Sequence, residues 1–324
     1  MTPLLAIRGL RTEFPTDDGL VVAVEDVDLD VFPGECLGVV GESGSGKSVT
    51  FLSVLGLVRA PGRVAGGSVV FQGHELRALS PDAMRALRGK AIALTFQDAQ
   101  TALNPALRVE EQITEVLLAH AEGPRAGRAA LRDRALDLLR LVGIPAPETR
   151  IADYPHQFSG GMRQRIMIAI ALACRPRLLI ADEPTSALDV TIQAQVLDLL
   201  DEIRRDLGTA VVLITHDLGV VAERCDRVAV MYAGQVVETG PTEQVIAAPR
   251  HPYTAGLLAS APWLDALEEN WRPMPGVVPS LIAPPAGCRF AARCPRREEA
   301  CAAPIALAQD GPRAFRCIRP LDVP

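Results

Sequence analysis

Residues 41–48 place the strongest constraint on how this 324-residue chain can fold. The segment reads Gly-Glu-Ser-Gly-Ser-Gly-Lys-Ser; it follows an apolar run at 36–40 that predicts a buried strand, and it precedes another that predicts a helix. Its glycines let the backbone turn tightly, so that N–H groups face inward and hold an anion at the positive end of the helix. This arrangement is typical of a phosphate-binding loop. The sequence therefore predicts that the chain binds a nucleoside triphosphate.

Two side chains of this loop have separate expected tasks. Lys47 is placed to reach the β- and γ-phosphates, and the Ser48 hydroxyl is placed to bind Mg²⁺. The whole loop contributes to the predicted site, which consists of Gly41, Glu42, Ser43, Gly44, Ser45, Gly46, Lys47 and Ser48.

Composition limits the classes of partner. The chain has 33 basic and 39 acidic residues, a net charge of -6, so it lacks the uniformly basic surface of a nucleic-acid binder and we expect no such partner. The longest uninterrupted apolar run, 166–174, has about half the length that a membrane span needs. The N-terminus lacks a charged-then-apolar signal segment. We therefore expect a cytoplasmic protein that reaches a membrane only through separate membrane-embedded partners.

Alternating strand and helix patterns predict a doubly wound α/β core. Strand candidates and helical periodicity alternate along the chain, with strands expected at 68–72, 91–96, 178–182, 210–215 and 227–232 and helices around 131–142 and 192–207. Residues 3–30 alternate apolar and polar side chains, which predicts an antiparallel β element. The strand signal disappears between about 104 and 175, which indicates a helical insertion. Frequent prolines after about residue 250 predict a linker, so we expect domains at 1–250 and 251–324.

A second group of polar residues follows the strand candidate at 178–182. Two carboxylates stand there: Asp182 can hold Mg²⁺ through water, and Glu183 can orient or deprotonate the attacking water. An acidic strand end is common on protein surfaces when it occurs alone. After a phosphate-binding loop in the same chain, it predicts hydrolysis of the bound nucleotide.

Residues 158–165, Phe-Ser-Gly-Gly-Met-Arg-Gln-Arg, open a strongly apolar helix. A Ser-Gly-Gly start leaves free N–H groups at the positive end of the helix dipole, which makes a second anion site. Here the chain resembles the ATP-binding subunits of ABC transporters over about residues 4–250, with Ser159, Gly160, Gly161 and Gln164 in the family signature. The resemblance implies a P-loop NTPase fold with an antiparallel β subdomain, a helical subdomain at about 104–175, and ATP and Mg²⁺ as cofactors.

The resemblance also implies roles for residues matched by position. Gln97 matches the glutamine that senses Mg²⁺ and faces the transmembrane subunits, and His216 matches the switch histidine that contacts the γ-phosphate. Asp189 ends the loop that touches the opposing subunit. Phe14 matches the aromatic residue that stacks on adenine, with Val22 as the alternative. Together with Glu183, Gln97 and His216 form the predicted catalytic set.

These assignments imply a shared nucleotide site. The Ser159–Gly161 helix start lies in the helical insertion, too far from its own phosphate loop to complete the same site, so we expect it to complete the site of a facing subunit. ATP binding then closes the pair of subunits and hydrolysis at Glu183 reopens it. We expect the motion to reach membrane partners through Gln97 and the helical insertion.

Departures from the commonest signature indicate which branch of the family the chain resembles. Phe158 and Met162 stand where many members have Leu and Gln, and residues 101–105 and 251–254 resemble the oligopeptide, dipeptide and nickel uptake branch. The resemblance implies import of di- or oligopeptides, with the chain peripheral on the cytoplasmic face of the bacterial inner membrane. Its implied partners are two permease subunits, a second homologous ATPase and an external solute-binding protein. A nickel or other metal-chelate importer is the alternative, and a soluble ABC ATPase acting on DNA or ribosomes is less favoured.

Four cysteines lie within the last 37 residues: Cys288, Cys294, Cys301 and Cys317. In a reducing cytosol such a cluster is more often a metal site than a pair of disulfides. The gaps of five, six and fifteen residues match neither common zinc ribbons nor ferredoxin runs, so spacing leaves zinc and iron–sulfur open. The tail also resembles the C-terminal extension of the same branch, which carries a 4Fe-4S cluster in some members, and this favours iron–sulfur over Zn²⁺.

Overall fold

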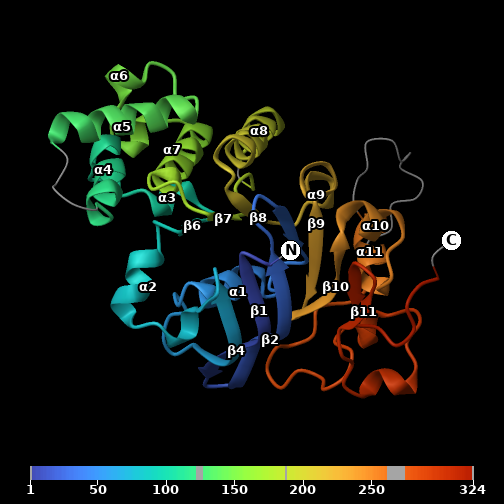
Figure 1. The fold of residues 1–324 in the computed structure, drawn as a ribbon. Coiled ribbons are helices and arrows are strands. Elements are labelled where there is room, and N and C mark those ends of the chain that lie inside the picture. The colour runs from blue at the N-terminus through green and yellow to red at the C-terminus, as the bar shows by residue number, and fades with distance from the viewer. Residues whose placement is uncertain (1, 122–126, 187, 261–273, 323–324) are drawn as a thin grey trace. The chain divides into compact units, whose positions relative to one another are not determined.

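The computed structural model describes residues 2–121, 127–186, 188–260 and 274–322 (Figure 1). The chain divides into two compact units: the first joins Met1–Ala78 to Leu213–Pro324, and the second is Leu79–Val212. Strand β8 (Ala210–Thr215) carries the chain from the second unit back into the first.

The first unit opens with an antiparallel sheet in the order β2-β1-β4-β5. Its strands are β1 (Leu5–Thr16), β2 (Gly19–Val31), β4 (Arg63–Phe71) and β5 (His74–Glu75). A two-residue turn joins β1 to β2 and pairs Thr16 with Gly19. Alternate apolar residues such as Leu5, Ile7 and Val24 are fully buried. This is the antiparallel element that the alternation at 3–30 predicts.

A second sheet in the same unit holds the phosphate-binding loop. Its parallel strands β3 (Cys36–Val40) and β9 (Arg227–Tyr232) lie side by side, and β9 turns back into the antiparallel β10 (Gln235–Pro241). Beyond β10 lie β12 (Arg313–Phe315) and β11 (Ala308–Asp310). The helices are α1 (Lys47–Val54), α9 (Leu218–Arg224), α10 (Thr242–Ala247) and α11 (Pro252–Ser260), with 3-10 turns at Leu76–Ala78, Ala291–Arg293 and Glu299–Ala302.

The second unit is mainly helical around two parallel strands, β6 (Ile92–Thr95) and β7 (Leu178–Asp182). Its helices are α2 (Pro81–Leu87), α3 (Ala99–Ala102), α4 (Val109–Ala119), α5 (Arg128–Leu141), α6 (Pro147–Arg150), α7 (Gly160–Leu172) and α8 (Val190–Leu207), with a 3-10 turn at Pro155–Gln157. Ile113 of α4, Leu139 of α5 and Ile168 of α7 are fully buried where these helices pack together. Between β6 and β7 the described residues form helices and turns.

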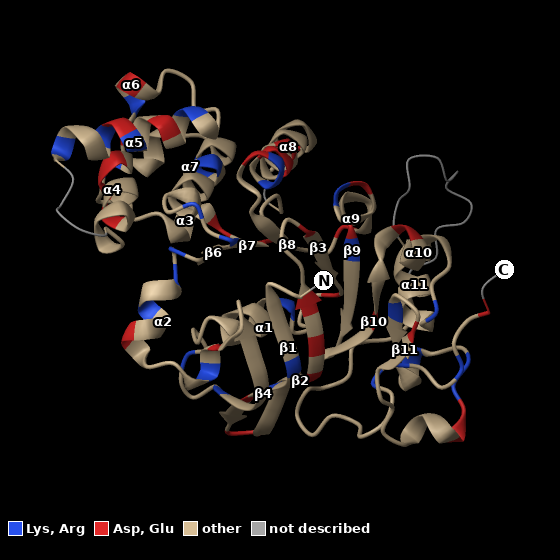
Figure 2. Cartoon of the chain, viewed as in Figure 1, with Lys and Arg blue, Asp and Glu red and all other residues tan. Residues whose placement is uncertain are grey.

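Charged side chains lie on the outer helices and are absent from the central strands β3 and β8. Figure 2 shows Lys, Arg, Asp and Glu along α4, α5 and α8, whereas β3 and β8 carry none. Strands covered on both faces are expected to be apolar throughout, and every residue of β3 and β8 is buried. No helix among the described residues combines the length and the apolar character needed to cross a bilayer.

Candidate functional site

The phosphate-binding loop connects β3 to α1, as the sequence predicts. Gly41, Gly44 and Gly46 have φ angles of 154°, 77° and 97°, a region that side-chain-bearing residues rarely adopt. Two of them also face backbone directly: an added Cβ would lie 2.1 Å from the carbonyl oxygen of Met231 at Gly41, and 2.6 Å from that of Ala23 at Gly46. Glycine is therefore required at both positions by conformation and by space.

Lys47 is folded back over the loop. Its ammonium donates to the carbonyl oxygens of Gly41, at 2.7 Å, and Glu42, at 3.0 Å, and the residue is only 6% exposed. Ser48 follows it in the first turn of α1, at the positive end of the helix dipole. The loop thus brings together a cation, a hydroxyl and a positive helix end, the combination that binds a phosphate chain with its metal ion.

The register of β1 separates the two candidates for the adenine contact. Phe14 pairs with Val21 and Glu13 pairs with Val22, so Phe14 and Val22 lie on opposite faces of the sheet. The ring of Phe14 lies over Gly62, where an added Cβ would stand 2.3 Å from it. On the same stretch of β1, the Thr12 hydroxyl is 2.7 Å from that of Ser53 on α1. These contacts favour Phe14, which lies on the α1 side.

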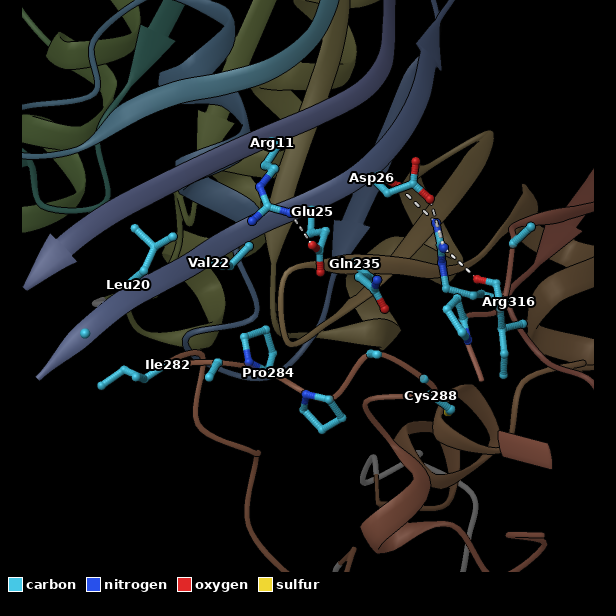
Figure 3. Close-up of a pocket in the computed structure, with 18 of the residues that line it drawn as sticks. Arg11, Leu20, Val22, Glu25, Asp26, Gln235, Ile282, Pro284, Cys288 and Arg316 are labelled. Atoms are coloured by element: carbon cyan, nitrogen blue, oxygen red, sulfur yellow. Dashed lines mark hydrogen bonds and ion pairs between the residues drawn. The ribbon is translucent and has the colours of Figure 1, made fainter. Parts of the chain in front are cut away.

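Val22 instead lines a separate cavity of about 1000 Å³. Residues of β1 and β2 form one side of it and the segment 282–288 the other (Figure 3). Figure 3 shows Arg316 reaching Asp26, at 3.0 Å, and Arg11 reaching Glu25, at 2.5 Å. Since these four charged groups already pair with one another, we assign no ligand to this cavity.

The second unit brings two predicted catalytic residues into direct contact. The Gln97 side-chain amide donates to a carboxylate oxygen of Glu183 at 2.8 Å. Glu183 stands immediately after β7, whose last residue is Asp182, and it has a φ of 43°. A non-glycine residue in the left-handed region is strained, and such strain gathers at functional sites. The amide therefore fixes the direction of a carboxylate that stands at the end of a rigid strand.

The signature residues begin α7, and its two glycines meet different surroundings. Ser159 caps the helix, since its hydroxyl accepts a hydrogen bond from the Met162 N–H at 3.4 Å. An added Cβ at Gly161 would lie 2.4 Å from Ile192 on α8, whereas at Gly160 the nearest heavy atom is 3.9 Å away. Gly161 is thus required for packing, whereas a Cβ at Gly160 would make only an ordinary van der Waals contact with Leu188. Gln164, one turn further along α7, is buried.

The remaining predicted residues lie at the ends of elements. Asp189 caps α8 by accepting a hydrogen bond from the Ile192 N–H at 3.0 Å, and Ala187 in the preceding loop lies outside the described residues. His216 directly follows β8 and is exposed, in the first unit. The loop, Phe14 and His216 therefore belong to the first unit, and the carboxylates, Gln97 and the signature to the second.

The four tail cysteines line one small cavity, together with His251 and Phe290. Burial raises the pKa of the Cys288 thiol to about 11, and it also raises the pKa of Cys294 and Cys317. Across the described ranges, however, no group of three or more His, Cys, Asp or Glu residues is placed to hold a metal ion. The geometry therefore gives no support to the iron–sulfur or zinc expectation beyond bringing the thiols to one cavity.

Sequence reasoning missed two residues that contact the phosphate-binding loop. The hydroxyl of Tyr253 accepts a hydrogen bond from the Glu42 N–H, and Arg293 pairs with the Glu42 carboxylate. Both lie more than 200 residues from the loop in the chain, and no local pattern reports such a contact.

Comparisons with known proteins agree with this geometry. A family described as ABC transporter matches residues 24–186, and one described as the C-terminal region of oligopeptide/dipeptide transporters matches residues 237–301. The dimeric ATP-binding cassette MJ0796, solved in a post-hydrolysis state with ADP and Pi, is 28% identical, with a TM-score of 0.66 over 74% of this chain and 98% of its own. Fold and site together define an ABC-type ATPase.

Relatives of greater identity cover nearly the whole chain. The dipeptide transport ATP-binding protein DppD of Bacillus subtilis is 51% identical over 93% of this chain and 89% of its own length. The oligopeptide transport ATP-binding protein OppD of Escherichia coli is 47% identical over 98% and 94%. This chain belongs to the family of oligopeptide and dipeptide transport ATP-binding proteins of ABC transporters. The resemblance and the P-loop NTPase fold predicted from sequence are thereby confirmed.

Proposed function

We propose that this chain hydrolyses ATP to power the import of di- and oligopeptides. The observation that carries the hydrolytic part is the Gln97–Glu183 hydrogen bond, in a chain that also has an intact phosphate-binding loop. The match of residues 237–301 to the C-terminal region of oligopeptide/dipeptide transporters supports the peptide cargo. The names of the relatives from B. subtilis and E. coli support it as well.

In this proposal each group of residues has one task. Lys47 and the loop N–H groups bind the phosphates, and Ser48, with Asp182 and Gln97, would hold Mg²⁺, which neutralises developing charge on the phosphates. Glu183 accepts a proton from the attacking water, and Gln97 keeps its carboxylate in position. His216 contacts the γ-phosphate and Phe14 stacks on adenine. The Ser159–Gly161 helix start and Asp189 serve the site of a facing subunit.

The proposed assembly contains two permease subunits and a second homologous ATPase, with an external solute-binding protein that delivers the cargo. The chain then works at the cytoplasmic face of the inner membrane. Purification of the tagged chain from membranes, followed by identification of its companions, tests this assembly. We expect two permeases and a second ATPase; recovery of soluble partners alone would contradict the importer assignment.

Transport by the reconstituted assembly tests the cargo. We expect ATP-dependent uptake of labelled dipeptides or oligopeptides into vesicles, and no uptake with the Glu183→Gln chain. Uptake of nickel or a metal chelate in place of peptides would favour the alternative importer.

We also propose that Cys288, Cys294, Cys301 and Cys317 hold a 4Fe-4S cluster. What supports this is that four soft thiol donors line one cavity in a short, proline-rich tail. A bound cluster would cross-link the tail. Metal analysis and visible absorbance of anaerobically purified protein test it: about four iron atoms per chain and a brown colour are expected, whereas colourless protein with one zinc ion would contradict it.

A further inference from the structure

Two residues of the C-terminal tail, the segment beyond residue 250, form hydrogen bonds with Glu42 of the phosphate-binding loop. The backbone N–H of Glu42 donates to the Tyr253 hydroxyl at 2.9 Å, and its carboxylate accepts from the Arg293 guanidinium at 2.9 Å. Arg293 is only 5% exposed in its side chain, and it also donates to the Tyr232 hydroxyl at 3.3 Å. One loop residue is thus held through both its main chain and its side chain by groups that lie outside the loop.

These holding groups are themselves firmly placed. Tyr253 and Tyr232 are fully buried, with ring centroids 4.5 Å apart, and both pack against Phe290. The Arg293 Nε donates to the Pro275 carbonyl at 2.9 Å, which fixes the other edge of the guanidinium. Side chains locked by packing and by hydrogen bonds are the kind that position a functional group accurately.

Glu42 also contacts Lys47, the lysine expected to bind phosphate. Lys47 donates to the Glu42 carbonyl at 3.0 Å and to the Gly41 carbonyl at 2.7 Å. The Glu42 N–H, already bonded to Tyr253, is not offered to phosphate, so the anion site is formed by the loop residues that follow it. Moving the Glu42 peptide would therefore move the surface against which Lys47 rests.

Charge gives Arg293 a second task. Glu42 places a carboxylate on a loop that binds a highly negative ligand, and like charges at short range disfavour binding. Arg293 neutralises that carboxylate in a setting where solvent screens little, since the Glu42 side chain is 27% exposed and the Arg293 side chain 5%.

We propose that Tyr253 and Arg293 are positioning residues of the ATP site: Tyr253 fixes the Glu42 peptide, and Arg293 fixes and neutralises its carboxylate. The proposal rests on the ATPase assignment and gives residues beyond position 250 a part in ATP binding. It predicts that loss of either contact weakens ATP binding more than it slows turnover at saturating ATP.

The test compares full-length variants by equilibrium binding of ATP and by steady-state ATPase kinetics. We expect Arg293→Met to weaken ATP binding about tenfold, while Arg293→Lys retains most of the affinity. Tyr253→Phe keeps the ring and should weaken binding about threefold, with kcat within about twofold of the parent. Arg319→Met is the matched control, because Arg319 forms an exposed 2.9 Å pair with Glu298 in the same tail, and it should bind ATP as the parent does.

The double variant Glu42→Gln/Arg293→Met separates the charge effect from general damage to the fold. If Arg293 acts by neutralising Glu42, removing both charges restores affinity to within about twofold of Glu42→Gln alone. The proposal for Arg293 would be overturned if the double variant bound ATP as weakly as Arg293→Met, or if Arg293→Met bound ATP like the parent. The proposal for Tyr253 would be overturned if Tyr253→Phe bound ATP with unchanged affinity. A parent chain that binds no ATP would instead remove the ATPase assignment.

Discussion

Glu238 is the residue whose loss should most weaken the attachment of the tail. It lies on β10 with no exposed surface, and its carboxylate accepts hydrogen bonds from the N–H groups of Arg250 and His251, both at 2.8 Å. It also accepts from the Arg313 guanidinium of β12 at 2.6 Å, and Arg313 is 9% exposed in its side chain. One carboxylate thus holds the start of the tail and its last strand.

The expected magnitude follows from this burial. Breaking a buried ion pair by removing one partner costs about 3–5 kcal/mol, because the other charge stays buried and uncompensated. Glu238→Gln keeps one oxygen that can accept a backbone N–H, so we expect the lower end, about 3 kcal/mol of unfolding free energy. Adding Arg313→Met removes the stranded charge, and we expect the double variant to recover at least about 1 kcal/mol of that loss.

Denaturant unfolding of the full chain measures these differences, and limited proteolysis reports whether the tail detaches first. The control is Asp30→Asn, which breaks a 2.7 Å pair with Arg8 in which the side chains are 29% and 49% exposed, and which should cost less than about 1 kcal/mol. A Glu238→Gln chain as stable as that control, or a double variant no more stable than Glu238→Gln, would refute the reasoning.

Three further predictions follow from single contacts. Glu183→Gln should bind ATP normally and lose at least about a hundredfold in turnover, because the water then lacks its base; equal hydrolysis by variant and parent would remove Glu183 from that role. Gly161→Ala should lower stability by about 1–3 kcal/mol in thermal unfolding, since its Cβ would lie 2.4 Å from Ile192, whereas Gly160→Ala, whose Cβ would meet only Leu188 at 3.9 Å, should unfold like the parent. Burial raises the pKa of the Cys174 thiol, so less of it is thiolate at pH 8, and its rate of alkylation should rise more between pH 8 and 9.5 than the roughly fourfold of a free cysteine. Peptide mass spectrometry of the alkylated protein measures that ratio, and a ratio equal to that of free cysteine would contradict the shift.

Sequence patterns located the strands whose surroundings are apolar on both faces. The predicted runs at 36–40, 178–182, 210–215 and 227–232 coincide with β3, β7, β8 and β9, because burial on both sides leaves a continuous apolar signature. The pattern did not reveal β10, whose apolar run is broken by Glu238 in its middle, or β12, which has only three residues and begins with Arg313. Those two residues, Glu238 and Arg313, are buried against each other, a pairing that only the folded chain makes visible.

In the functional site, too, local patterns were predictable from the sequence and long-range contacts were not. Local spacing was enough for the loop from Gly41 to Ser48, because a strand, a tight turn and a helix start lie within a few residues of one another. The role expected for Gln97 followed from the family resemblance, and that of Glu183 from the acidic end of a strand; their contact across 86 residues was not predicted. The contacts of Tyr253 and Arg293 with Glu42 span more than 200 residues. Neither local spacing nor the family resemblance predicted them.

Charge pairs join the tail to the rest of its unit at four points. Each of four tail arginines is less than a tenth exposed in its side chain and pairs with one carboxylate outside the tail: Arg289 with Glu25, Arg293 with Glu42, Arg313 with Glu238, and Arg316 with Asp26. The carboxylate side chains differ in exposure, at 28%, 27%, 0% and 57% in that order. Solvent screens an exposed partner and leaves a buried one uncompensated when its pair is broken. The cost of neutralising each carboxylate should therefore be largest at Glu238, intermediate at Glu42 and Glu25, and smallest at Asp26, so the tail is held most strongly at β10 and reaches the phosphate-binding loop from that anchor.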